Sequence, residues 1–368
     1  MGKSRTLLII STGGTIAQVR DKYTLASKDV GTTKGDDFAA LLGDELEEFG
    51  YEVNAETILS KDSSNIVPDD WEKIIDTIVR NYDTCDSFLI THGTNTLGYT
   101  SAALSFALGN LAKRVVLTGS QVPHGASGSD ALMNLQNAAR VAMTDHRTLH
   151  GVVAVFGSKI ITGTRVKKRT EFDYDGFESF STIQPIGHVG RVVKFDDEAL
   201  ERHMGLYKSR ARTAEQLDVR KKFNMNIASL TEFPGMNPKI FEILVKEAKV
   251  EGFVFRAVGA GDPNIVPIPE GKTETIESYD NLREGFKFLQ NMGIPIVVTT
   301  QSSKGVASMD VNPSGKDAYK MGAIPAWDMS IEAMTVKLGW LLGQNVRYEH
   351  IRGQMLLPVK GEIVVGND

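Results

Sequence analysis

The chain has 368 residues, of which 41% are hydrophobic and 24% charged, and its formal net charge is −5. This composition is ordinary for a globular enzyme, and the length favours two domains over a single core. A negative chain with no basic run longer than Lys167-Lys168-Arg169 argues against nucleic acid as an obligatory partner. The single cysteine, Cys85, cannot form an intrachain disulfide, so stability should not depend on an oxidising compartment.

The first apolar segment favours a strand over a targeting signal. Lys3 and Arg5 precede only a short apolar run, residues 7–10, which is too short for the apolar core of a secretory signal. No apolar run approaches the length of a membrane span, so no membrane partner is expected. We therefore expect a cytoplasmic protein whose first strand lies here.

Three short apolar runs in the first third of the chain each lead directly into a loop rich in hydroxyl groups and glycine. Residues 7–10 precede Ser-Thr-Gly-Gly-Thr (11–15), 88–90 precede Thr-His-Gly-Thr-Asn-Thr (91–96), and 115–117 precede Thr-Gly-Ser-Gln (118–121). Ligands bind beyond the carboxyl ends of the strands in open α/β sheets, so these loops indicate a site. Threonines beside glycine favour an amide- or ester-cleaving enzyme with a threonine nucleophile.

Helical patterns separate these strands. A helix is expected from Pro68, with Trp71, Ile74, Ile75, Ile78 and Val79 on one face. A second, apolar helix is expected over 98–111. A third is expected from a cap at Ser129 or Asp130 to about Met143, with Leu132, Leu135 and Ala139 inward. With a buried strand at 151–156, this order predicts a doubly wound, mostly parallel sheet.

The second half predicts a smaller α/β domain. Residues 196–222 are charged and broken in pattern, which indicates a linker carrying an insertion. Strands are expected at 252–256 and 294–299, with helices at 280–292 and 328–343 and a loop at 259–264. The domains are therefore expected at 1–195 and 226–368, joined by 196–225.

The candidate chemistry involves two threonines and one lysine. Thr15 follows two glycines, which let the backbone turn tightly and leave room for a substrate, and Thr94 follows His92-Gly93. A hydroxyl nucleophile needs a base, and a partly buried Lys168 with a lowered pKa could supply one, although composition alone favours a surface lysine. His92 is expected to be a hydrogen-bonded structural residue. For Asp130, the sequence supports a role as a helix N-cap at least as well as it supports a catalytic role.

Neither a metal nor a nucleotide cofactor is expected. Apart from His146 and His150, the seven histidines are dispersed along the chain, and a single cysteine excludes a CxxC pair. The loop at 11–15 lacks the G-x-G-x-x-G pattern of dinucleotide-binding proteins.

Taken together, these segments resemble the bacterial-type L-asparaginases, and the resemblance covers nearly the whole chain. The segments are Ser-Thr-Gly-Gly-Thr-Ile-Ala (11–17), Thr-His-Gly-Thr-Asn-Thr (91–96), Leu-Thr-Gly-Ser-Gln (117–121) and Gly-Ala-Ile-Pro (322–325) before Asp328-Met329. The segment Asp62-Ser63-Ser64 and the expected lack of a signal peptide are similar to the cytoplasmic, type I branch.

The resemblance implies a role for each matched residue. Thr15 would be the nucleophile, with Tyr23 close to its hydroxyl on a lid over about 15–30. Thr94 and Lys168 would activate it or a water. The remaining matches are Ser63 and Ser64, where the family binds the substrate's α-carboxylate and α-amino ends, and Asn264. Separately, we expect backbone N–H groups near Gly14 and Gly93 to stabilise the oxyanion. Because the family lends the residue matching Asn264 to a neighbouring subunit, a homodimer or homotetramer is implied; no cofactor or metal is.

One position departs from the family. Asn95 stands where the family has an aspartate that holds the substrate's α-ammonium beside the catalytic lysine. A charged hydrogen bond is worth about 1.5–3 kcal/mol and a neutral one about 1, so affinity for such a substrate could fall about tenfold. Three explanations stay open: a natural variant of a working enzyme, an engineered substitution that traps substrate, or a substrate without a free α-amino group.

The leading hypothesis is hydrolysis of L-asparagine to L-aspartate and ammonia through an acyl-enzyme on Thr15. One alternative is the asparaginase-like subunit of a tRNA-dependent amidotransferase. Such subunits carry an additional N-terminal domain, whereas the first strand here is expected at about residue 6. A third hypothesis, favoured by Asn95, is a catalytically weakened binder of amino acids, or an enzyme with an altered substrate.

Overall fold

The computed structural model describes residues 5–20, 27–28, 33–48, 50–145, 148–181, 183–208, 217–265 and 281–364. The chain divides into two units, 1–221 and 222–368. Each unit contains a sheet with helices packed against it, so the predicted α/β class with a smaller second domain is confirmed.

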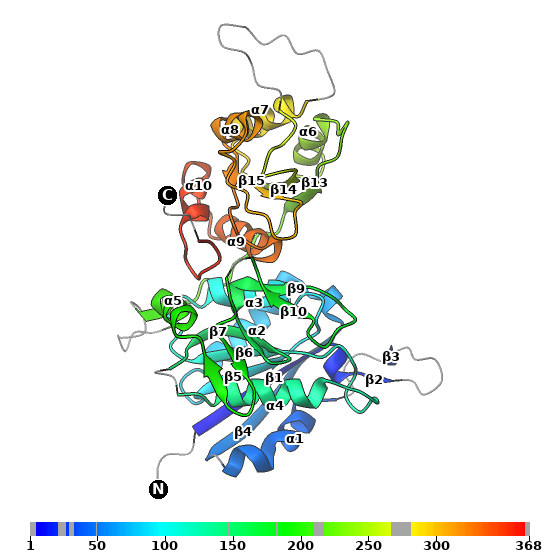
Figure 1. Cartoon of the computed structure of the whole chain (residues 1–368), viewed down its shortest axis with the longest axis vertical. Coiled ribbons are helices and arrows are strands. Elements are labelled where there is room, and N and C mark those ends of the chain that lie inside the picture. The colour runs from blue at the N-terminus through cyan, green and yellow to red at the C-terminus, as the bar shows by residue number, and fades with distance from the viewer. Residues whose placement is uncertain are drawn as a thin grey trace, which may run out of the picture. The chain divides into compact units, whose positions relative to one another are not determined.

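A single large sheet forms the centre of the first unit (Figure 1). Its order in the described residues is β12-β11-β8-β7-β6-β5-β1-β4. The strands are β1 (Arg5–Gly13), β4 (Tyr51–Lys61), β5 (Ser87–Thr91), β6 (Arg114–Thr118), β7 (Gly151–Phe156), β8 (Lys159–Thr162), β11 (Gly187–Val189) and β12 (Val193–Phe195). The strands from β4 to β7 are parallel, while β8, β11 and β12 extend one edge antiparallel. The prediction of a mostly parallel sheet is confirmed.

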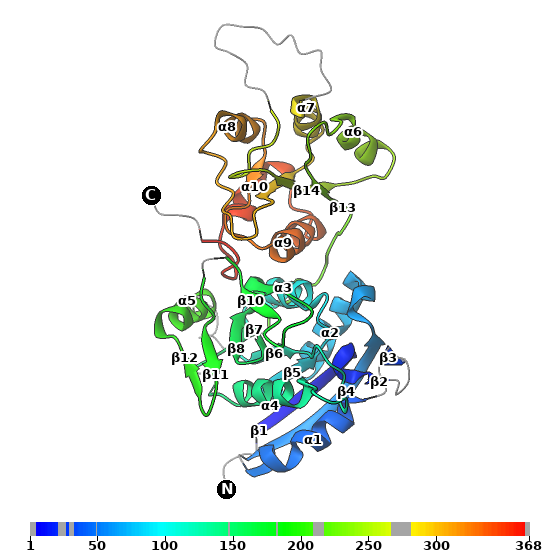
Figure 2. The ribbon, with the colours of Figure 1, turned by 45° about the vertical axis from the view of Figure 1, so that its right-hand side comes forward.

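Helices cover both faces of this sheet, as Figure 2 shows. On one face, α1 (Gly35–Glu48) and α4 (Ala131–Ala142) bury Leu42 and Leu135 in one core with Leu7 and Val116 of the sheet. On the other face lie α2 (Pro68–Arg80) and α3 (Leu97–Ala107). Such two-sided cover explains why the strands read as continuous apolar runs, with Leu7 to Ile10 at most 2% exposed.

Two predicted core residues are exposed. Leu132 is 40% exposed, and the buried side of α4 is instead Ala131, Asn134, Leu135, Ala138 and Ala139. Small alanines allow the helix to lie close to the sheet, and the buried Asn134 amide hydrogen-bonds to the Gly119 carbonyl, which fixes this rotation. Val79, at the end of α2, is 38% exposed for a related reason: the side formed by Trp71, Ile74, Ile75 and Ile78 faces inward.

The loops of the first unit contain shorter helices and strand pairs. They are η1 (Thr15–Ala17), η2 (Ser63–Asn65), η3 (Gly163–Arg165) and the strand pairs β2 (Val19–Arg20) with β3 (Ser27–Lys28) and β9 (Val166–Lys168) with β10 (Phe177–Ser179).

The segment 196–225, predicted as a linker, starts with a helix of the first unit. In α5 (Asp197–Lys208), Ala199 joins the core of the sheet, and Nδ1 of the buried His203 lies 3.1 Å from Thr162 Oγ1. Nε2 of His203 lies 2.9 Å from the His150 carbonyl oxygen, to which it donates. Residues 209–216 lie outside the described residues, and the division between the units falls between 221 and 222.

The second unit contains a parallel sheet in the order β13-β14-β15-β16. The strands are β13 (Ile227–Thr231), β14 (Gly252–Ala257), β15 (Ile296–Thr300) and β16 (Ile324–Pro325), and the helices are α6 (Lys239–Lys246), α7 (Arg283–Met292), α8 (Pro313–Lys320), α9 (Ile331–Gly343) and α10 (Tyr348–Leu356). Phe241 is the centre of its core, with ring centroids 5.4–5.7 Å from those of Phe253, Phe255 and Phe286. The strands and long helices predicted here are present, with ends shifted by a few residues.

Candidate functional site

The three hydroxyl- and glycine-rich loops start at one level of the sheet. Ser11 of β1 pairs with Thr91 of β5, and Thr91 pairs with Thr118 of β6. The loops that follow therefore leave the sheet at the same carboxyl edge, as predicted.

The first two loops are in direct backbone contact. A Cβ on Gly14 would lie 2.3 Å from the Cα of Gly93, and Gly14 has a φ of +80°, so only glycine fits there. A Cβ on Gly93 would lie 2.6 Å from Ser63 Oγ, which brings η2 against the same point. Two glycines thus let three segments converge, and this contact is what places Thr15 near the second loop.

Thr15 is half-buried at the start of η1. Its hydroxyl makes no hydrogen bond to any residue that the structure describes, which is the condition of a group available to a ligand. Its partner expected from the resemblance, Tyr23, lies outside the described residues, as does half of the expected lid, residues 21–26 and 29–30.

Thr94, Lys168, Asn95 and Ser64 form one hydrogen-bonded chain. Lys168 Nζ donates to Thr94 Oγ1 and to Asn95 Oδ1, at 2.9 Å in both cases. Asn95 Nδ2 donates to Ser64 Oγ at 2.9 Å. The Thr94 side is buried and the Ser64 side is exposed, so the chain runs from the protein interior to its surface.

Ser63 and Ser64 are held by a short turn after β4. The Asp62 carboxylate accepts the Ser64 amide hydrogen at 2.7 Å, in the manner of an N-cap. Ser63 Oγ accepts from the Asn95 amide at 3.2 Å, and its carbonyl accepts from Thr96 Oγ1 at 2.7 Å. Both serines therefore lie beside the second loop.

Burial makes Lys168 easier to deprotonate than an exposed lysine. Lys168 ends β9, paired with Phe177 of β10, and burial lowers the pKa of its ammonium, which the carboxylates of Glu171 and Asp62 partly offset. A lysine that loses its proton more easily and touches a threonine hydroxyl is suited to accept a proton through that hydroxyl.

His92 is a structural residue, as predicted. Its Nδ1 lies 2.7 Å from the Gly93 carbonyl, which can only accept, so Nδ1 carries the hydrogen and Nε2 accepts from Thr100 Oγ1 at 3.0 Å. Trp71 Nε1 donates in turn to Thr100 Oγ1 at 3.1 Å. Burial lowers the pKa of His92 to about 4, so the ring is neutral and holds the second loop in place. No pattern in the sequence indicated that Thr100 and Trp71 would hydrogen-bond in this way to hold the His92 ring.

Asp130 positions the third loop. Its carboxylate accepts the amide hydrogens of Gln121 and Val122, at 3.0 and 2.9 Å, and bonds Asn134 Nδ2 at 2.9 Å. It stands at the N-cap position of α4 without capping the helix by its side chain, because its carboxylate turns to Gln121 and Val122; Ser129 Oγ accepts from Ala131 N. The predicted N-cap role of Asp130 is therefore wrong for its side chain.

Asn264 belongs to the second unit and is exposed after β14. Its amide donates to Glu232 Oε1 at 2.6 Å, and its carbonyl accepts from Leu282 N at 2.8 Å. Glu232 is 6% exposed and its pKa is raised by burial. Glu232 directly follows β13. Its place as a polar residue at the end of a strand is the sequence signal that could have identified it as a partner of Asn264.

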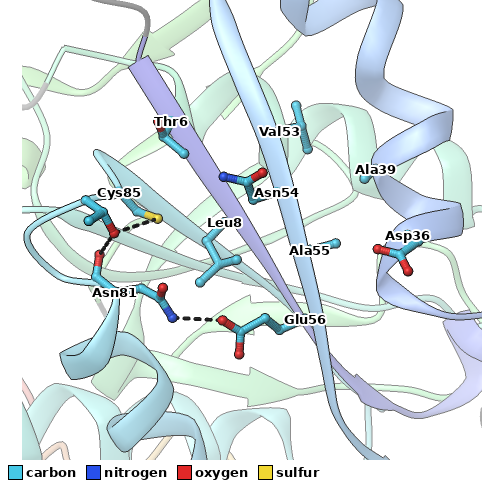
Figure 3. Close-up of a pocket in the computed structure, with 11 residues that line it drawn as sticks. Thr6, Leu8, Asp36, Ala39, Val53, Asn54, Ala55, Glu56, Asn81 and Cys85 are labelled. Carbon is cyan, nitrogen blue, oxygen red and sulfur yellow. Dashed lines mark hydrogen bonds between the residues drawn. The ribbon is translucent and has the colours of Figure 1, made fainter.

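A pocket of about 570 Å³ lies away from these loops, along the edge strand β4 (Figure 3). Glu56 in its wall accepts from Asn81 Nδ2 at 2.9 Å and from Arg80 at 2.5 Å. Cys85 also lines it, and burial raises the pKa of the thiol, which keeps it protonated and a poor nucleophile. Its lining includes the carboxylates of Asp36 and Glu56 but no residue of the three hydroxyl- and glycine-rich loops, and it is not the candidate site.

Within the described residues, no group of three or more histidine, cysteine, aspartate or glutamate side chains could hold a metal ion. A search of the same residues finds no helix that is long and apolar enough to span a membrane.

Comparison with known proteins gives a consistent result over both units. The family model "Asparaginase, N-terminal" matches residues 6–201, and "Glutaminase/Asparaginase C-terminal domain" matches 226–355. The chain is 33% identical to an L-asparaginase of Thermococcus kodakarensis, over 97% of this chain and 98% of that protein. It is 32% identical to a subunit of the glutamyl-tRNA(Gln) amidotransferase of the same organism, over 97% of this chain and 76% of that subunit. The solved structure of the thermostable L-asparaginase from Thermococcus kodakarensis superposes with a TM-score of 0.82 at 31% identity, covering 98% of this chain and 100% of the other.

Proposed function

This chain belongs to the asparaginase family, and we propose that it hydrolyses the side-chain amide of L-asparagine, giving L-aspartate and ammonia. The observation that carries the proposal is the hydrogen bond of 2.9 Å between Lys168 Nζ and Thr94 Oγ1, beside a loop contact that brings Thr15 to the same place. Hydroxyl groups activated by a base are what acyl transfer requires.

In the first half of the proposed reaction, Thr15 Oγ1 attacks the amide carbon and loses its proton toward neutral Lys168, by way of Thr94. The tetrahedral oxyanion needs N–H donors. Gly14 N already donates to the Lys61 carbonyl at 2.9 Å, whereas the amides of Thr15, Gly93 and Thr94 donate to no described residue. We therefore assign the oxyanion to the amides of Thr15 and the second loop rather than to that of Gly14. Gly14 instead allows the close backbone contact with Gly93.

In the second half, the C–N bond breaks and the leaving nitrogen takes the proton held by Lys168, which releases ammonia. Water then attacks the Thr15 ester, with its proton accepted through Thr94 and Lys168. Aspartate leaves and the Thr15 hydroxyl is restored. Because the reacting amide lies between the two threonines, the rest of the substrate extends to the remaining polar groups, Ser63, Ser64 and Asn95.

The pH dependence of the reaction should reflect Lys168. If neutral Lys168 is the base, kcat/KM rises with pH and levels off at an apparent pKa below that of an ordinary lysine, because burial lowers it. Replacing Glu171 by glutamine removes an opposing charge and should move this acid limb to lower pH. A limb that stays in place in Glu171→Gln, with activity retained, would assign the titration to another group.

The neighbouring-subunit role of Asn264 is part of the proposal. Asn264→Ala should abolish most ammonia release, and mixing these subunits with inactive Thr15→Ala subunits should restore part of it, since a mixed dimer holds one intact site. Light scattering should give a dimer or tetramer. A monomer with full activity would remove Asn264 from the site.

The direct test is ammonia release from L-asparagine by this chain alone. Turnover without tRNA or another subunit supports the amidohydrolase. Binding of L-asparagine with no release over hours would instead favour a binder, and release only with added amidotransferase components would favour that alternative.

A further inference from the structure

The Asn95 amide has a fixed orientation in the candidate site. Lys168 Nζ donates a hydrogen bond of 2.9 Å to Asn95, so the amide atom that faces it is the acceptor Oδ1. Nδ2 then faces Ser64 Oγ at 2.9 Å and donates to it. Two partners on opposite sides of the amide thus determine which end faces which neighbour.

This orientation determines what the two serines can offer. Ser64 Oγ accepts from Asn95 Nδ2, and Ser63 Oγ accepts from the Asn95 backbone amide at 3.2 Å. Each hydroxyl accepts one of these bonds through one lone pair and keeps its own hydrogen for a donor bond to a ligand. Asn95 Nδ2 has a second hydrogen as well. The end of the site formed by Ser63, Ser64 and Asn95 therefore presents three hydrogens and only neutral acceptors.

The charges around this end point the same way. Lys168 donates to Thr94 and Asn95 and to no carboxylate among the described residues. The carboxylates of Asp62 and Glu171 act on Lys168 from further away, and Asp62 is already bonded to Ser64 N at 2.7 Å. A substrate ammonium placed beside Asn95 would meet the free hydrogens of the two serines and of Asn95 and only neutral acceptors, with no carboxylate in contact among the described residues of this chain.

We propose that this end of the site selects amides whose α-substituent is an uncharged hydrogen-bond acceptor, such as an acylated amine or a hydroxyl, over amides with a free α-ammonium. The inference rests on the proposed function and names its substrate class. An acceptor would take the free hydrogens of Ser64 and Asn95 and, unlike an ammonium, would need no anionic partner. L-Asparagine remains a substrate, but a poorer one.

The test compares kcat/KM for L-asparagine, N-acetyl-L-asparagine and (S)-2-hydroxysuccinamic acid, measured as ammonia release by the full chain. The unaltered protein should favour at least one of the two acceptor-bearing amides over L-asparagine by about tenfold. Preference for the acetylated amide alone would identify acylated amines as the class, and preference for both would identify the acceptor itself. The variant Asn95→Asp puts an anionic acceptor at the same place and should reverse the preference.

Asn65→Asp is the matched control. Asn65 is exposed in η2, so this variant adds the same charge to the neighbouring segment without altering the Asn95 amide, and it should keep the original preference. Higher kcat/KM for L-asparagine than for both other amides would overturn the inference and leave the proposed function standing. So would an equal reversal in Asn65→Asp. Absence of ammonia from all three amides, with the protein and with Asn95→Asp, would overturn the proposed function itself.

Discussion

Replacement of Thr15 by alanine should lower kcat for ammonia release from L-asparagine by at least about a thousandfold. The variant loses the oxygen atom that forms the acyl-enzyme. No other hydroxyl among the described residues of η1 could replace it as the nucleophile. The free energy of unfolding should change by less than about 0.5 kcal/mol, since the Thr15 hydroxyl bonds to no described residue. Single-turnover ammonia release and urea denaturation measure the two quantities.

Thr15→Ser serves as the control because it keeps a hydroxyl at the same position, and it should retain activity within about tenfold. Trapping with hydroxylamine should detect the acyl intermediate in the parent and in Thr15→Ser, but not in Thr15→Ala. Should Thr15→Ala turn over normally while Thr94→Ala does not, Thr94 would be the nucleophile and the order of the two threonines in the mechanism would be reversed.

Glu362→Gln should lower the free energy of unfolding of the second unit by about 3–5 kcal/mol. Lys337 of α9 and Glu362 form an ion pair in which both side chains are 0% exposed. Lys337 Nζ also donates to the carbonyls of Met355 and Leu357, at 2.8 and 2.7 Å. Glu362 accepts the amide hydrogens of Val359 and Lys360, at 3.1 and 2.7 Å. Neutralising the carboxylate leaves the buried ammonium without its counter-charge, although the shape of the side chain is kept.

The pair also attaches the segment after α10 to α9, so its loss should be local. Hydrogen exchange of the α9 amides should accelerate in Glu362→Gln, while the amides of β5 and β6 in the first unit keep their protection. The control is Glu242→Gln, which removes the same charge from an exposed pair with Lys246, and the denaturation midpoint should not move. Equal effects of the two substitutions would show that burial of the Lys337–Glu362 pair contributes nothing.

The sequence identified most of the fold because the signals it depends on are local. Apolar runs of three or four residues that lead into glycine and threonine predicted β1, β5 and β6, and the rule that parallel strands present their carboxyl ends together predicted that Thr15 and Thr94 share an edge. The predictions that Leu132 and Val79 are buried were wrong for a local reason as well. A helical period identifies a stripe of apolar residues, but several rotations of α2 or α4 about the helix axis fit that stripe.

The sequence by itself therefore determined the succession of strands and helices along the chain, the loops that carry hydroxyl groups, and the departure at Asn95. Only the tertiary structure decided the contact between Lys168 and Thr94, which are 74 residues apart, and the orientation of the Asn95 amide between Lys168 and Ser64. It also decided that Gly14 N is already bonded to Lys61 and that Asp130 supports a loop rather than a helix end. The physical reason is that apolar periodicity depends only on residues close together in the sequence. Hydrogen-bond partners and burial depend on segments that packing brings together from distant parts of the chain.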